Sequence, residues 1–199
     1  IPDYQYEYGS GSRGQKPTTQ GEAVANGRMS WGAPLDGEPV IQHDGVMRPY
    51  VAQKDNIRNF YDLGSTFSNT LALNGGSESL NFRFSVSNMD NAGIVPNSKL
   101  NRITFNLSAN ANLSDKVIFE GRAQYSIEDA KNRTAIADFT ANPNASIGVM
   151  ATSLDVRTLA PGYDENGFET PWNDYNFVTN PYFAVNKVRN GDDRKRFIG

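Results

Sequence analysis

Four runs of sequence between residues 66 and 128 alternate between apolar and polar side chains at successive positions. The clearest run is Leu80–Ser87, where Leu, Phe and Val take every second position and Asn, Arg and Ser take the positions between them. The other runs begin near Thr66, Arg102 and Val117. Successive side chains of a β-strand leave opposite faces of the pleat, so a period of two predicts strands. We therefore expect four consecutive strands over residues 65–130.

The length and polarity of these runs suggest what the strands face. Arg102–Leu113 and Val117–Glu128 are about twice the usual 5–6 residues and long enough for a tilted strand to cross a bilayer, which takes about 9–11 residues. One set of alternate positions is polar and the other is uncharged. This favours the wall of a transmembrane β-barrel, with hydrocarbon on one side and a hydrated lumen on the other. The alternative is a soluble or surface-attached β-rich binding module, such as a glycan-binding sandwich, in which the apolar face meets a second sheet.

The connections between the runs alternate in length. Gly75–Ser79 and Ser114–Asp115 are tight, whereas Asn88–Lys99 is longer. Residues 9–64 and 131–193 are much longer still and rich in Gly, Pro, Asp and Asn. Outer-membrane barrels carry short turns on the periplasmic rim and long loops on the outer rim. We therefore predict that residues 9–64 and 131–193 are extracellular loops.

Some local structure is expected inside and beside these loops. Short strands are predicted near Val40–Gln42 and Met47–Val51, one helix over Lys54–Leu63, and one or two helices within Ile136–Leu159. Residues 1–8, with Tyr4, Tyr6 and Tyr8 on one face, are predicted to end an earlier strand, and residues 194–199 to start the next. The predicted fold class is all-β: a segment of a large antiparallel transmembrane β-barrel with long extracellular loops. Because the sequence starts at Ile1 without a methionine and stops where a strand begins, we expect a piece of a longer protein.

Composition narrows the function. The formal net charge of the 199 residues is −3, which gives no reason to expect nucleic-acid binding. Hydrophobic residues make up 38% and the mean hydropathy is −0.57, a value that transmembrane barrels share with soluble proteins because half of each strand faces water. No apolar stretch reaches the roughly 18 residues of a transmembrane helix. The sequence has no cysteine, so we expect neither disulfides nor a cysteine metal site.

No stretch carries the signature of a catalytic or metal centre. The only histidine, His43, stands in a loop beside Asp44 and is predicted to be a surface residue. Asp164–Glu169 is acidic but too short for a twelve-residue calcium loop, and we expect a turn there. Phosphate-binding, serine-hydrolase and zinc-protease motifs are missing from the sequence. We therefore expect no enzyme activity, no cofactor and no bound metal.

Two sets of residues are candidates for contact with a transported molecule. The first is the polar face of the strands, where charged side chains either pair across strands or line a polar path. The second is a set of loop aromatics that either touch cargo or a partner protein or pack within the loops. The candidate lumen-lining residues are Arg83, Arg102, Asn106, Glu120, Arg122 and Gln124; the candidate loop contacts are Trp31, Trp172, Tyr175 and Tyr182.

Five stretches, in order along the chain, resemble motifs of the SusC/RagA family of TonB-dependent outer-membrane transporters of Bacteroidetes. Ala33 and Tyr61 depart from the family pattern, since a helix-breaking or basic residue is common at the first position and Phe at the second. The stretches are Ser30–Gly37 (SWGAPLDG), Asp55–Gly64 (DNIRNFYDLG), Asn69–Gly76 with Phe82–Ser85 (NTLALNGG and FRFS), Gly93–Asn97 (GIVPN) and Leu113–Lys116 (LSDK).

The resemblance implies a barrel of about 22 strands with a plugged lumen. It also implies location in the bacterial outer membrane, a SusD-like surface lipoprotein as a lid, and energy from the TonB system. The resemblance further implies that the plug domain and the segment that contacts TonB are absent from this sequence. The cargo it implies is an oligosaccharide or, less often, a peptide. These expectations come from the resemblance and not from the alternation of side chains.

Overall fold

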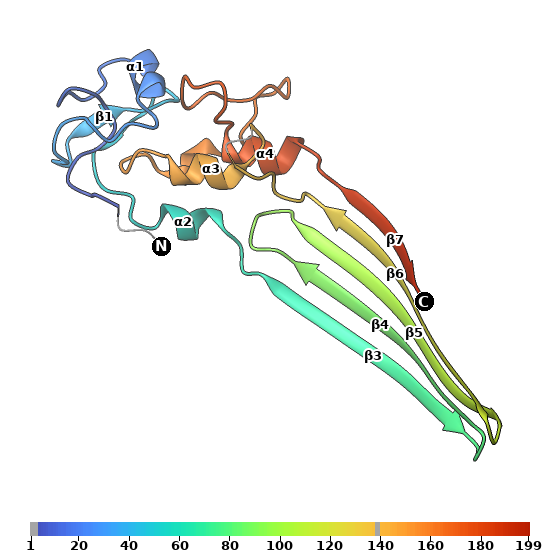
Figure 1. Ribbon diagram of the computed structural model, residues 1–199. Helices are drawn as coiled ribbons and strands as arrows, with labels where there is room; N and C mark the ends of the chain where they lie inside the picture. Colours follow the sequence, from blue (N-terminus) through green and yellow to red (C-terminus); the bar gives the residue numbers. More distant parts are fainter. Residues whose placement is uncertain (1–3, 138–139) are drawn as a thin grey trace. The chain divides into compact units, whose positions relative to one another are not determined.

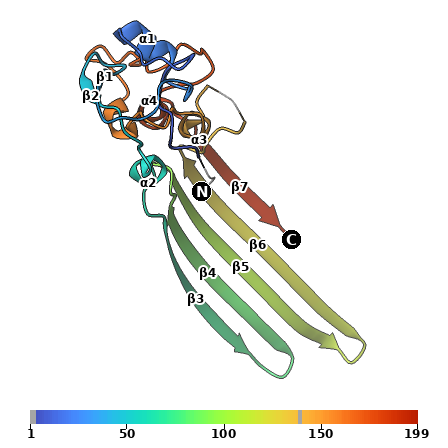
Figure 2. The same ribbon diagram turned by 90° about the vertical axis from the view of Figure 1, so that its left-hand side faces the viewer.

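The predicted strands form one antiparallel sheet in the computed structural model, which describes residues 4–137 and 140–199. The sheet has five strands in sequence order, joined by hairpin connections except for the last strand, which follows a long excursion of the chain (Figures 1 and 2). Its strands are β3 (Ser65–Gly76), β4 (Leu80–Ala92), β5 (Lys99–Ser114), β6 (Val117–Lys131) and β7 (Asp192–Ile198). Each of these strands pairs only with its neighbours in that order.

The strand register places like residues in rows across the sheet. Leu73 lies opposite Phe84, which lies opposite Leu107. One residue further along each strand, Asn74 lies opposite Arg83, and Arg83 opposite Ser108. A shift of one residue would move every apolar side chain to the other face, so the alternating pattern itself fixes this register. A bulge between Asn112 and Ser114 interrupts the ladder at the β5–β6 turn.

The chain divides into two units. The sheet unit contains Leu63–Arg133 and Asn190–Gly199, and the globular unit contains Ile1–Asp62 and Thr134–Arg189. The globular unit has only short elements: α1 (Gln20–Ala25), β1 (Pro39–Ile41), β2 (Met47–Pro49), α2 (Asn56–Phe60), α3 (Pro143–Gly148), the 3-10 helix η1 (Val156–Leu159) and α4 (Pro181–Lys187).

The globular unit has a core of its own. Tyr50, Val156 and Trp172 have no exposed surface, and Leu159 and Phe60 are almost fully buried. Polar contacts also join its two sequence segments. The Thr152 hydroxyl donates to the Tyr8 carbonyl at 2.8 Å, and the Ser10 N–H donates to the Ser153 hydroxyl at 2.7 Å. The long stretches predicted as loops are therefore packed together over residues 4–62, 134–137 and 140–189.

Several expectations can be compared with these elements. With 40% of the chain in strands and 14% in helices, and with antiparallel sheets, the all-β part of the predicted fold class is confirmed. The two short strands are found at Pro39–Ile41 and Met47–Pro49. The helix predicted over Lys54–Leu63 is half as long, Asn56–Phe60. The strand predicted at residues 1–8 is wrong for the described residues 4–8, where Tyr8 makes only an isolated bridge to Pro34.

Within the described part of the chain, none of the helices is long and apolar enough to span a membrane.

Candidate functional site

One face of the sheet is an exposed apolar band. Many of its side chains are largely exposed: Leu71 is 65% exposed, Leu107 48% and Phe119 52%. The band consists of consecutive cross-strand rows, among them Leu73–Phe84–Leu107–Ala123 and Leu71–Val86–Phe105–Tyr125–Phe197.

On β4, β5 and β6 the apolar band gives way to polar and charged residues toward one end of the strands. Two residues beyond Ile127, the same face carries Asp129, which lies in one row with Asn101 and Asp90. Lys131 follows two residues later. The face is therefore apolar over most of the sheet and charged at the end where β4 and β6 finish.

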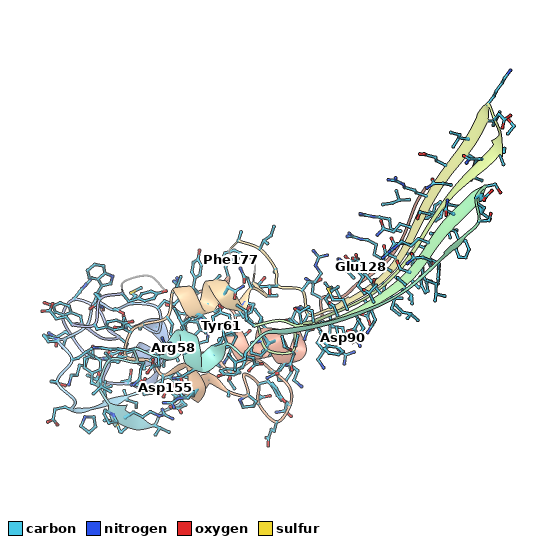
Figure 3. The ribbon with its side chains drawn as sticks, turned by 90° about the horizontal axis from the view of Figure 1, so that it is seen from below. Arg58, Tyr61, Asp90, Glu128, Asp155 and Phe177 are labelled. Atoms are coloured by element: carbon cyan, nitrogen blue, oxygen red, sulfur yellow. The ribbon has the colours of Figure 1, made fainter. Side chains whose placement is uncertain are left out.

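The opposite face of the sheet is polar. Across β3–β6 one row consists of hydroxyl residues, and the Thr70 and Ser87 hydroxyls in it are 2.9 Å apart. The neighbouring row contains Ser85, Asn106 and Gln124, with the Asn106 amide donating to the Ser85 hydroxyl at 3.4 Å. Figure 3 views this sheet close to edge-on, with Glu128 leaving the polar face and Asp90 leaving the other.

A hollow of about 290 Å³ on the polar face gathers four of the six predicted lumen residues: Arg83, Asn106, Arg122 and Gln124. Arg83 and Arg122 lie in the row Asn74–Arg83–Ser108–Arg122, with one strand between them. Two strand spacings separate their Cα atoms by about 10 Å. Neither arginine has an ion-pair partner within the described residues; Arg83 donates to the Asn74 amide oxygen at 3.4 Å. The hollow thus offers two cationic donors beside neutral amides and hydroxyls.

The other two predicted lumen residues lie outside the hollow. Arg102 faces Glu128 across the β5–β6 pair, with Nε and Oε1 2.8 Å apart, although the N–H is not aligned for a hydrogen bond. Pairing across strands was one of the two alternatives for the charged side chains on this face, the other being to line a polar path. Arg102 and Glu128 form such a pair. Glu120 lies opposite Asn110, one row beyond Arg83 and Arg122.

A larger cavity, about 800 Å³, lies within the globular unit. Tyr4, Tyr8 and Trp31 supply its aromatic lining, and Met150 and Val149 add apolar surface. Trp31 is 76% exposed. Of the four predicted loop contacts, only Trp31 lines this cavity.

Arg28 also lines the cavity, although no motif in the sequence marks it. The helix α1 ends before Asn26, and Gly27 then packs so closely against the Trp172 backbone that a Cβ would clash with the Trp172 carbonyl oxygen. This contact brings Arg28 over the ring of Tyr175, with 4.2 Å between the guanidinium carbon and the ring centroid. A pairing of residues so far apart in sequence has no local pattern that could reveal it.

The remaining predicted loop contacts have different environments. Trp172 follows the second alternative for these aromatics, packing within the loops: it has no exposed surface, because it packs against Gly27 in the core, and its indole N–H has no hydrogen-bond partner among the described residues. Tyr182 is half-buried, with its ring edge-on to Phe60 at 5.4 Å between centroids. Tyr175 is 46% exposed and lies against Phe177 (Figure 3) as well as Arg28.

The prediction that His43 is a surface residue is wrong. His43 is 7% exposed, and its Nδ1 has no hydrogen-bond partner in the part of the chain that the structure describes. Burial, the largest influence, lowers the pKa of this imidazole. The neighbouring Asp44 instead pairs with Arg48 through two bonds of 2.7 and 2.6 Å. Within the described residues, no group of three or more His, Cys, Asp or Glu side chains is placed to hold a metal ion.

Comparison of the chain with models of protein families and with curated proteins gives no match.

Proposed function

We propose that this chain is a segment of an outer-membrane nutrient importer, where the sheet forms part of a β-barrel wall and the globular unit forms its external region. The observation that carries the proposal is the apolar band, which is broad and exposed and which no second sheet covers within the sheet unit. Large exposed apolar patches mark contact with a partner or a membrane.

The dimensions of the band support contact with lipid. On β6 the apolar positions run from Val117 to Ile127, a span of about 34 Å at the usual rise per residue. A tilt of about 45° reduces this to a height of roughly 24 Å, close to the roughly 25 Å apolar band of outer-membrane barrels. The charged residues Asp129 and Lys131 follow directly, as expected where a strand leaves the hydrocarbon.

The polar face and the sheet edges are consistent with this interpretation. A tilted strand in a barrel wall bends around the lumen, and Glu128 leaves the inner side of the bend in Figure 3. Within the described chain, β3 and β7 each pair on one side only. Long unpaired edges are normally covered or closed, which agrees with further strands on both sides in a complete barrel. The β-sandwich alternative lacks this support, because the apolar side chains stay exposed instead of meeting a second sheet.

The partners and cargo rest on the resemblance to the SusC/RagA family. They are outer-membrane lipid, a SusD-like lipoprotein over the external region, and the TonB system acting through a segment outside this sequence. We propose oligosaccharide or peptide as cargo. The neutral amides and hydroxyls around the hollow at Arg83 and Arg122 suit a hydroxyl- or amide-rich solute, which passes through without bond chemistry.

A pair of substitutions on β5 tests the membrane assignment. Leu107 lies in the apolar band and Asn110 on the polar face of the same strand. Leu107→Arg is expected to cost about 2–4 kcal/mol near the bilayer midplane and to reduce the amount of assembled protein in outer-membrane fractions. Asn110→Arg, opposite Glu120, is expected to leave assembly near the unsubstituted level. Equal assembly of the two variants would exclude lipid contact at Leu107.

A further inference from the structure

The cavity of the globular unit has the properties of a small-molecule site. Its volume of about 800 Å³ falls within the range of about 300–1,000 Å³ typical of ligand pockets, which are mostly apolar with a few polar groups. Tyr4, Tyr8 and Trp31 provide flat apolar surfaces, and Met150 provides a deformable one. Such a lining favours a planar apolar group, because aromatic rings pack offset or edge-on against one another.

Arg28 is the cationic residue among those that line the cavity. Its Nε is buried without a hydrogen-bond partner, and none of the ion pairs among residues 4–137 and 140–199 includes it. The guanidinium carbon lies over the Tyr175 ring, 4.2 Å from the ring centroid, and this contact provides no oxygen acceptor for the guanidinium N–H groups. Arg28 as a whole is partly buried, and a carboxylate is the partner that the planar fork of an arginine fits best.

We propose that this cavity binds a small carboxylate that carries a planar apolar ring. The ring lies against Trp31 and the two tyrosines, and the carboxylate accepts hydrogen bonds from the edge of the Arg28 guanidinium. Tyr175 acts as a positioning residue that holds the guanidinium in place. All these residues belong to the globular unit, so the inference does not depend on where the sheet resides.

The probe is 2-naphthoate, with 2-naphthalenemethanol as a neutral compound of similar shape, in equilibrium dialysis with the full chain. The unsubstituted protein is expected to bind 2-naphthoate saturably and at least about tenfold more tightly than the neutral compound. Arg28→Gln is expected to raise the Kd of 2-naphthoate by about tenfold or more, the usual effect of losing a charge-assisted hydrogen-bonded pair, and to leave the Kd of the neutral compound unchanged. Trp31→Ala is expected to weaken both.

Arg58→Gln is the matched control, since Arg58 is an exposed arginine on α2 of the same unit (Figure 3) and does not line the cavity. Arg28→Lys keeps the charge but not the planar fork and is expected to lie between the unsubstituted protein and Arg28→Gln. The near-UV circular dichroism spectrum verifies the fold of each variant. If Arg28→Gln does not fold, the proposal is tested by comparing the affinities of the unsubstituted protein for 2-naphthoate and for the neutral compound. Equal affinity for both compounds, an unchanged Kd in a folded Arg28→Gln variant, or no saturable binding of 2-naphthoate would overturn the proposal.

Discussion

At the scale of single residues, the pKa of Asp44, a turn residue, is lowered by hydrogen bonds from the nearby Arg48. The side chain stands in the Asp-Gly turn between β1 and β2, where its Oδ1 also accepts from the Val46 N–H at 3.1 Å. Both carboxylate oxygens accept from Arg48, and these hydrogen bonds are the main reason that the pKa of Asp44 falls to about 2. The pair therefore links the stability of this hairpin to pH.

The Asp44–Arg48 pair is expected to add stability above the ordinary carboxyl pKa of 3.8 and to lose it as the pH falls toward about 2. The sign follows because the pKa is lower in the folded state, so the unfolded state takes up the proton first on acidification. Solvent screening limits the pair to roughly 1 kcal/mol or less. Denaturant unfolding of the Asp44→Asn variant between pH 5 and 2 is expected to lack this part of the pH dependence.

Asp174→Asn is the control for this measurement, because Asp174 is an exposed loop residue of the same unit. Its unfolding profile is expected to follow that of the unsubstituted protein. If Asp44→Asn and Asp174→Asn gave the same profile, the bonds to Arg48 would contribute nothing to stability in solution.

At the scale of elements, the short helix α4 depends on one residue. Asn180 is fully buried, and its Oδ1 accepts from the N–H groups of Tyr182 at 3.0 Å and Phe183 at 3.4 Å. Its Nδ2 donates to the carbonyls of Leu159 at 3.1 Å and Thr170 at 3.2 Å. Asn180 therefore caps α4 and joins this helix to Leu159 in η1 and to Thr170 in the segment that precedes α4.

Asn180→Ala is expected to lower the free energy of unfolding of the globular unit by about 2–4 kcal/mol. Loss of the cap accounts for about 1 kcal/mol, and the buried carbonyls left without a donor account for the rest. Thr19→Ala removes a cap too, because the Thr19 hydroxyl accepts from the Glu22 N–H at 3.2 Å on the exposed helix α1. This control is expected to cost about 1 kcal/mol. Similar losses for the two variants in denaturant unfolding would show that the buried bonds of Asn180 add nothing beyond capping.

The elements differ in how far the sequence alone could predict them. The long strands were predictable because alternation is local: the Leu80–Ser87 pattern starts where β4 starts. The helix predicted over Lys54–Leu63 was too long, because α2 is held by distant contacts. The Asn56 side chain accepts from the Val156 N–H at 2.9 Å and donates to the Leu154 carbonyl at 2.6 Å. Short elements of this kind are set by tertiary packing rather than by their own pattern.

The candidate sites differ in the same way: some of their residues follow from a local pattern, and others depend on contacts with distant parts of the chain. Arg83, Asn106, Arg122 and Gln124 were predictable as one surface because strand parity puts them on one face and register brings them together. The burial of Trp172 was not, because it depends on Gly27 in another part of the chain. For the same reason the cavity beside Arg28 had no signature in the sequence.

At the scale of the whole molecule, the proposal requires different surroundings for adjacent residues of β4. Arg83 lies on the polar face, Phe84 lies in the apolar band, and Asp90 lies on the same face as Phe84 but beyond the band. The chain has no cysteine, so single cysteines at these three positions can each carry one fluorescent bimane group without interference. The variants are Arg83→Cys, Phe84→Cys and Asp90→Cys.

In reconstituted membranes, bimane at position 84 is expected to be quenched by brominated acyl chains and not by aqueous iodide. Positions 83 and 90 are expected to show the reverse, because one faces the hydrated lumen and the other lies past the hydrocarbon. The three outcomes together distinguish lipid from a protein partner: a partner covering the apolar band would protect position 84 from both quenchers. Protection of position 84 from both quenchers would show that a protein, and not the bilayer, covers the apolar band. Iodide quenching at all three positions would show that the band lies in water and would contradict the importer proposal.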